Sequence, residues 1–299
     1  MKLIPLLRSS RVASRWSNRP DSCTTRRGLN RVIDTDTPLL TSPDTAQLYR
    51  DALEMLNRCG VPYLVGGTYA FQYYAGIART TKDFDIFVRP RDVRRVLDVL
   101  TRCGFKTEIA FDHWLAKAHH GEKFIDVIYS SGNAVAEVDD EWFAHAVDET
   151  VLGTPVKLVP AEEMIWTKAF IMERERYDGA DVAHMLRHCA GLINWERLVR
   201  RFAAHWRVLL NHLVLFGFIY PGERSLIPSA VIKDLLGRVQ AELEVPTRDS
   251  KVCQGTLLSR AQYLVDIDDW GYEDARLTPR GAMTPEQIAE WTAGIDKSH

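Results

Sequence analysis

Two aspartates that stand two residues apart inside an apolar segment constrain this chain more than any other feature of its sequence. Residues 83–88 read DFDIFV. On a β-strand, side chains at i and i+2 lie on the same face, so Asp83 and Asp85 converge while Phe84 and Ile86 pack on the other face. Like charges this close raise each other's pKa, and a hard divalent cation such as Mg²⁺ removes that cost. The alternative is an edge strand that carries two solvated acids.

A glycine pair precedes this segment. The apolar run 61–65 predicts a short buried strand, which Gly66-Gly67 ends before a helix over residues 68–75 begins. A strand that leads through glycines into a helix presents backbone N–H groups to a phosphate. A plain tight turn at the two glycines is the alternative.

A third acid follows on a later predicted strand. Asp126 stands in the middle of residues 123–129, a run of mainly apolar, β-branched and aromatic side chains. A lone charge in such a strand needs a partner. That partner is either a metal ion shared with the two earlier aspartates or a basic side chain such as Lys123.

Hydrophobic periodicity predicts a mixed α/β (α+β) fold, in which a small mixed β-sheet with helices is followed by a helical domain. Helices are predicted over 44–59 and 91–103, and from Pro160 onward the pattern is helical, beginning with a helix over 161–175. We therefore expect four parts: a basic segment over 1–41, an α/β domain over 42–158, a helical domain over 159–245 and an unassigned C-terminal extension over 246–299.

Composition excludes several classes of protein. Lys and Arg number 38 against 40 Asp and Glu, and the resulting net charge of −2 predicts no bulk binding to a polyanion. Five cysteines are scattered without a CxxC pair, which argues against a disulfide framework or zinc ribbon and indicates a reducing compartment, the cytoplasm. The longest apolar run, 208–220, is too short and too polar to span a bilayer, so we expect a buried helix and no membrane contact.

The first residues depart from this charge balance. Residues 1–31 hold eight basic residues and one acid. The Arg- and Ser-rich composition of residues 1–40 resembles an organelle transit peptide. The alternatives are a disordered tail, a start codon placed too far upstream, or a basic arm that touches RNA.

Taken together, these motifs resemble the nucleotidyltransferase superfamily related to DNA polymerase β. The pattern there is an apolar residue and two glycines before a helix, two aspartates alternating with apolar residues, and a third acid on a later strand. The match spans about residues 45–190 and looks especially like the bacterial branch, which includes antibiotic nucleotidyltransferases and nucleotidyltransferase toxins. In this chain the pattern is carried by Val65-Gly66-Gly67, by Asp83 and Asp85, and by Asp126.

The resemblance implies that residues 42–158 are the catalytic domain and that an NTP is the substrate. It also implies two Mg²⁺ ions held by Asp83, Asp85 and Asp126, with Asp126 placed to take the proton of the attacking hydroxyl. The residues that would contact the phosphates are Gly66, Gly67, Thr68, Arg79, Lys82 and Lys168.

The predicted helix over 161–175 leads into the less specific part of the resemblance. Related enzymes often use a lysine on such a helix to hold the triphosphate, which implies that role for Lys168; a solvated helix lysine is the alternative. Asp178 and Asp181 resemble a turn found after this helix in several of these families. We interpret them instead as a helix N-cap and its capping-box partner.

The expected activity is that of a Mg²⁺-dependent transferase. It would move a nucleoside monophosphate from an NTP, such as ATP, to a hydroxyl acceptor and release pyrophosphate. The acceptor is a tRNA end, a small molecule or a protein, and the toxin branch allows an antitoxin partner that the sequence does not show. A catalytically silent nucleotide-binding or regulatory protein and a metal-dependent phosphohydrolase are the alternatives. All three acids are present, which favours an active enzyme.

Overall fold

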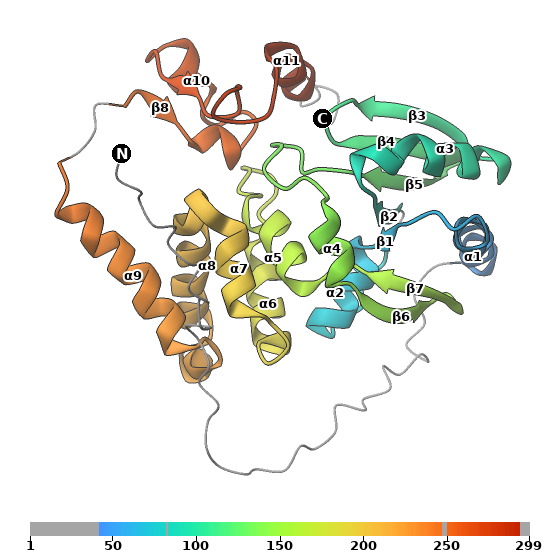
Figure 1. Ribbon diagram of the computed structural model, residues 1–299, viewed down its shortest axis with the longest axis horizontal. Helices are drawn as coiled ribbons and strands as arrows, with labels where there is room; N and C mark the ends of the chain where they lie inside the picture. The colour runs from blue at the N-terminus through green and yellow to red at the C-terminus, as the bar shows by residue number, and fades with distance from the viewer. Residues whose placement is uncertain (1–41, 82, 247–249, 294–299) are drawn as a thin grey trace, which may run out of the picture. The chain divides into compact units, whose positions relative to one another are not determined.

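The computed structural model describes residues 42–81, 83–246 and 250–293, all of which lie in one compact unit, Thr35–His299. The basic segment 1–41 and Lys82 lie outside the described residues. Figure 1 shows a mixed sheet flanked by helices, a bundle of further helices and a C-terminal segment. The predicted mixed α/β fold is therefore confirmed.

A seven-stranded sheet carries the two strands with the aspartates at its centre. Its order is β3-β4-β5-β2-β1-β7-β6; β2 pairs in parallel with β5 and β1 in parallel with β7, and the other pairs are antiparallel. The two strands that carry the aspartates, β2 and β5, each have a hydrogen-bonded neighbour on both sides, which fixes their positions. The strands are β1 Leu64–Val65, β2 Asp83–Phe87, β3 Lys106–Phe111, β4 Leu115–His120, β5 Lys123–Ile128, β6 Val147–Val151 and β7 Thr154–Leu158.

The predicted alternation of β2 is confirmed by burial. Phe84 and Ile86 are fully buried, whereas Asp83 and Asp85 are only partly buried. Phe84 packs against the rings of Tyr49 and Tyr69, with centroid separations of 5.1 and 4.7 Å. These aromatic contacts anchor the apolar face of β2, so the aspartates project from the opposite face.

Among the described residues, three of the four helices in the α/β part form where the sequence predicts them, whereas the short helix Asp140–Ala144 was not predicted. Ser42 caps the first helix, since its Oγ accepts a hydrogen bond from the Thr45 amide at 3.4 Å. The predicted helix over 91–103 is observed from Val93, after a short 3₁₀ turn over Pro90–Asp92. The helices are α1 Pro43–Arg58, α2 Gly67–Ala75, α3 Val93–Arg102 and α4 Asp140–Ala144.

A helical bundle follows the sheet. Helix α5 packs against α6 and α7, and α2 of the α/β part packs against α6, which joins the two parts. Glu162 and Glu163 of α5 form buried ion pairs with Arg197 of α7. The helices are α5 Ala161–Ala169, α6 Gly179–Cys189, α7 Trp195–Phe202, α8 Trp206–Ile219 and α9 Ser229–Leu243.

The predicted helix over 161–175 is wrong in its second half, because α5 ends at Ala169. Contacts with the C-terminal segment explain the difference. The amide of Met172 donates to the carbonyl of Leu258 at 3.1 Å, and the Glu173 carboxylate accepts from Ser259 at 2.7 Å. These long-range partners take the place of further helical turns.

Helices α7 and α8 together form Trp195–Ile219, which is long and apolar enough to cross a membrane by length and composition alone. A 3₁₀ turn over Ala203–His205 separates the two helices. Leu209, Leu213 and Phe216 are buried in the hydrophobic core. The buried helix predicted for 208–220 is therefore confirmed on one face only, since Val214, Phe218 and Ile219 are exposed.

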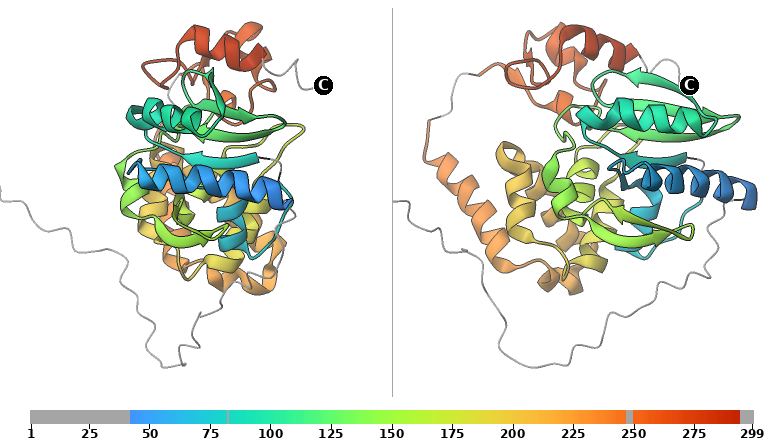
Figure 2. Two further views of the ribbon diagram at one scale, coloured as in Figure 1. Left: turned by 90° about the vertical axis from the view of Figure 1, so that its right-hand side faces the viewer. Right: turned by 45° about the vertical axis from the view of Figure 1, so that its right-hand side comes forward.

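The C-terminal extension, which the sequence left unassigned, has short elements of its own. They are β8 Val252–Cys253, α10 Leu264–Asp268, β9 Glu273–Asp274 and α11 Pro285–Ala293, with β8 and β9 paired in parallel. Both views of Figure 2 place this orange-to-red segment beside β3, and α11 contacts β3. It lies in the same compact unit as the sheet.

Candidate active site

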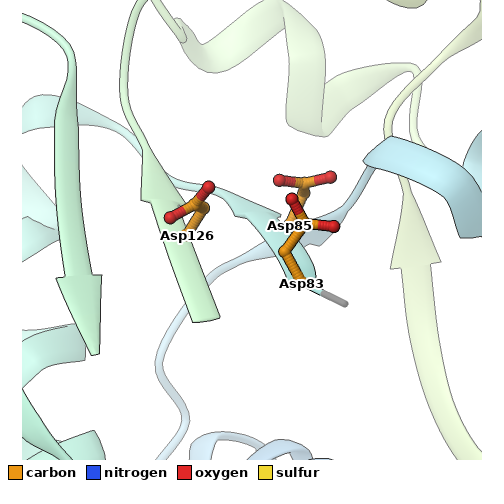
Figure 3. Close-up of side chains that lie close together, drawn as sticks. All are labelled: Asp83, Asp85 and Asp126. Atoms are coloured by element: carbon orange, nitrogen blue, oxygen red, sulfur yellow. The ribbon is translucent and has the colours of Figure 1, made fainter. Parts of the chain in front are cut away.

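Parallel pairing of β2 and β5 brings the three predicted acids together. Asp85 lies directly beside Asp126 in the register of the two strands, and Asp83 lies two residues earlier on the same face. One carboxylate oxygen from each of the three lies within 4.8 Å of the others, and Figure 3 shows the three side chains gathered on one side of the strands. Three hard oxygen donors at this separation fit Mg²⁺.

Burial and mutual repulsion disturb the ionisation of this group. Burial, followed by the charges of Asp83 and Asp126, raises the pKa of Asp85 to about 7. Burial also raises the pKa of Asp126, although a hydrogen bond from Lys117 opposes the rise. The cluster therefore holds negative charge at a free-energy cost, which a bound cation would relieve.

Asp126 has a basic partner, but it is not Lys123. Lys117 Nζ, on the neighbouring strand β4, lies 2.8 Å from Asp126 Oδ1. The same ammonium lies 4.5 Å from the centre of the Phe124 ring. The sequence could not indicate Lys117 until the register of β4 against β5 was known, because the two residues belong to different strands.

The glycine pair is fitted closely to Asp85. The Gly66 amide donates to the Asp85 carbonyl at 3.0 Å, and Gly67 opens α2 with φ of +52°. A Cβ atom at Gly67 would overlap the Asp85 carboxylate. Thr68 lies in the first turn of α2 and is partly buried. It is not among the described residues that line the cavity next to the aspartates. Gly67 therefore places a helix N-terminus against the acids, where only glycine fits.

Lys168 is held by two carboxylates of the helical bundle. Its Nζ lies 3.1 Å from Asp178 Oδ2 and 2.7 Å from Asp181 Oδ2, and only 16% of its side chain is exposed. Arg79 binds Asp181 through both terminal nitrogens, at 2.6 and 3.0 Å. Arg176 binds Asp178 through Nε and Nη2, each at 3.0 Å. A solvated lysine is therefore excluded at position 168.

The interpretation of Asp178 and Asp181 as a capping pair is wrong. Asp178 occupies the N-cap position of α6, yet within the described residues its side chain makes no capping hydrogen bond. Burial alone would raise the pKa of both carboxyls, but hydrogen bonds from Arg176 and Arg79 and the charge of Lys168 lower it. Both acids stay ionised and hold three cations, whose attraction outweighs the local backbone bond.

A cavity of about 430 Å³ is lined by residues from the three-aspartate cluster and from the group around Lys168. Its size falls in the range of small-molecule sites. Arg176 lines this cavity, although the sequence analysis did not select it as a site residue. Lys82, which it did select, lies outside the described residues. The cavity is lined by the three aspartates and by Gly67, Lys168 and Arg176.

The sequence of this chain was compared with models of known protein families and with curated protein sequences. Residues 45–215, more than half of the chain, match a family model described as uncharacterised nucleotidyltransferase. A comparison with curated protein sequences finds no match.

The chain also resembles several solved structures. The antibiotic-resistance factor ANT(2'')-Ia is 17% identical over 56% of this chain and 96% of its own, with a TM-score of 0.42. The lincosamide antibiotic adenylyltransferase LnuA, bound to lincomycin, is 13% identical over 46% and 94%, with a TM-score of 0.34. An antigenic nucleotidyltransferase-like protein from Paracoccidioides brasiliensis is 18% identical over 49% and 77%, with a TM-score of 0.33.

Proposed function

We propose the following activity, since this chain belongs to the nucleotidyltransferase family whose model it matches. It transfers a nucleoside monophosphate from an NTP to a hydroxyl acceptor, with Mg²⁺ as cofactor. The observation that carries the proposal is the meeting of Asp83, Asp85 and Asp126 beside the Gly66-Gly67 turn. Chemically, the acceptor oxygen bonds to the α-phosphorus while the bond from that phosphorus to the bridging oxygen breaks. Pyrophosphate leaves with the electron pair of the broken bond.

The three carboxylates are the proposed ligands of two Mg²⁺ ions. Asp83 and Asp85 would bind both ions, and Asp126 would complete the site on the acceptor side. When bound, the ions lower the pKa of the acceptor hydroxyl and neutralise the phosphate charge. Asp126 lines the cavity, which supports its assignment as the group that takes the hydroxyl proton.

The cations around Asp178 and Asp181 are the proposed triphosphate contacts. Lys168 and Arg176 line the same cavity as the three aspartates, and Arg79 shares Asp181 with Lys168. Fixed positive groups bind phosphate oxygens without reorganising. The amides at the start of α2, at Gly67 and Thr68, would add hydrogen bonds to the same phosphates.

The boundaries at 42–158 for the catalytic domain and 159–245 for the helical domain remain part of the proposal, as does a cytoplasmic location. The four cysteines among the described residues are free, which supports a reducing compartment. An antitoxin partner stays a prediction from the resemblance alone.

Incubation with each α-³²P-labelled NTP, Mg²⁺ and a cell extract as the source of acceptors tests the proposal. We expect label in a new phosphodiester and release of pyrophosphate. Binding without turnover would indicate a silent nucleotide-binding protein, and release of free phosphate would indicate a phosphohydrolase; either result contradicts the transferase.

Asp83→Asn supplies the matched test of the acids. It should reduce transfer at least about a hundredfold, because it removes a metal ligand. Asp148→Asn is the control, since the Asp148 side chain is 85% exposed on β6, and this variant should retain wild-type turnover.

A further inference from the structure

We infer that residues 250–293 form the acceptor-binding wall of the cavity, and that the acceptor is a small hydroxylated molecule with a flat apolar face. This inference rests on the proposed function and narrows it. The segment lies beyond residue 215, where the match to the family model ends. It nevertheless supplies Leu257, Leu258, Arg260 and Trp291 to the cavity that holds the three aspartates.

The segment is fixed at two places, Leu257 and Trp291, to the loop that follows β5. The Asn133 amide donates to the Leu257 carbonyl at 2.6 Å, in a buried hydrogen bond. Trp291 packs on Gly132, where a Cβ atom would come within 2.8 Å of the indole. Trp291 is only 9% exposed. A buried hydrogen bond and an aromatic contact that requires glycine indicate a built wall.

Residues 258–260 of the segment are fixed in turn to the loop that follows α5. Arg260 Nε lies 3.1 Å from Glu173 Oε1, and the Ser259 hydroxyl donates to Oε2 of the same carboxylate at 2.7 Å. The amide of Met172 donates to the Leu258 carbonyl. The segment is therefore held by the loops that follow β5 and α5, and both loops also line the cavity.

The lining predicts the chemistry of the acceptor. Trp114 and Trp291 bring aromatic rings to the cavity, and Leu257 and Leu258 add apolar surface. Aromatic side chains of this kind bind flat apolar faces. The charged wall residue, Arg260, is already paired with Glu173. The wall therefore suits a molecule with an apolar ring and a hydroxyl better than a polyanion.

Size and charge both argue against an RNA acceptor. The cavity of about 430 Å³ has the size of a small-molecule site. Residues 250–293 hold seven acidic and four basic side chains. RNA recognition depends on Lys and Arg that neutralise phosphates, and this segment has no excess of them.

The test asks where the wild-type protein places the label. The protein is incubated with α-³²P-labelled NTP and Mg²⁺ together with a cell extract divided into material below about 1 kDa, RNA and protein. We expect label in the small fraction, in a compound that resists alkaline phosphatase because its phosphate is a diester. Label in RNA or protein would overturn the inference and leave the proposed function standing. Absence of both label and pyrophosphate in every fraction would instead refute the proposed function itself.

Two variants test the wall directly. Trp291→Ala removes the aromatic face, and Leu258→Trp fills the cavity while leaving the anchoring contacts in place. Each should reduce labelling of the small fraction at least about tenfold, and binding of the α,β-methylene NTP analogue with Mg²⁺, measured by calorimetry, should stay within about twofold of wild type. Trp270→Ala is the control, since Trp270 lies in the same segment and is 61% exposed.

The two variants also keep the inference falsifiable if one of them folds poorly. Leu258→Trp retains the Trp291 contact, so it decides the result where Trp291→Ala is unstable. Wild-type labelling in Leu258→Trp would overturn the inference. Loss of analogue binding in Leu258→Trp would also overturn it, because the wall would then belong to the nucleotide.

Discussion

Replacing Asp85 by Asn should stabilise the protein when divalent cations are absent, and the gain should grow with pH. Burial and the charges of Asp83 and Asp126 raise the pKa of Asp85 from 3.8 to about 7. Between these two values the folded protein keeps a proton that the unfolded chain has released. The folded state therefore loses stability as pH rises from about 4 to 7, and the loss is complete above 7.

The size of the effect follows from that pKa. One pH unit of difference corresponds to about 1.4 kcal/mol, so a carboxyl raised from 3.8 to about 7 costs the folded state up to about 4 kcal/mol. Asp85 is only partly buried and lines an open cavity. Solvent will reduce the cost, and we expect a gain of about 2–4 kcal/mol for Asp85→Asn at pH 7.5 and little gain at pH 4.5.

Urea unfolding followed by tryptophan fluorescence measures this gain, in EDTA at pH 4.5, 5.5, 6.5 and 7.5. Asp98→Asn is the control, because Asp98 is exposed on α3, and its difference from wild type should not change with pH. Adding Mg²⁺ should stabilise the wild type and leave Asp85→Asn unchanged. A difference for Asp85→Asn that is constant across this range would refute the electrostatic reasoning.

Three further changes test other parts of the site. Asp126→Asn should remove the rise in melting temperature of several degrees that Mg²⁺ with an NTP analogue gives the wild type in thermal scans; an equal rise in both would remove Asp126 from the site. Asp181→Asn should raise KM for the NTP about tenfold with a smaller change in kcat, because Lys168 loses its 2.7 Å partner, and an unchanged KM in steady-state assays would contradict that role. Gly67→Ala should destabilise the protein by about 2 kcal/mol or more in urea unfolding and abolish transfer, owing to its positive φ and the overlap with the Asp85 carboxylate. Gly237→Ala is its control: this site in α9 is open among the described residues, so the change should stabilise by up to about 1 kcal/mol.

The cluster of three aspartates was predictable because its geometry follows from short segments. Alternation along β2 places Asp83 and Asp85 on one face whatever the rest of the chain does. A single additional fact, the parallel pairing of β2 with β5, then brings Asp126 beside them. The glycine turn was equally local, since Gly66-Gly67 both ends β1 and opens α2.

The partners of these groups were not predictable in the same way. Lys117 reaches Asp126 across a strand pair, and its role depends on a register that no local pattern states. Asp178 stands where an N-cap belongs, so the sequence favoured a local hydrogen bond. In the folded chain Lys168 and Arg176 bind this carboxylate instead, because each offers a full positive charge whereas a backbone N–H at the start of a helix offers only a dipole.

The proposed acceptor-binding wall, residues 250–293, depends most strongly on contacts between residues far apart in the sequence. The hydrogen bond between Asn133 and Leu257 joins residues 124 positions apart, and Glu173 meets Arg260 across 87 positions. Elements as short as β8 and β9 leave almost no periodic signal. Chemistry that depends on one strand's alternation can therefore be recognised from sequence, whereas the surface that would select the acceptor is assembled only by distant contacts. If that division holds, substitutions at Leu258 and Trp291 should reduce transfer to the acceptor without changing the affinity for NTP.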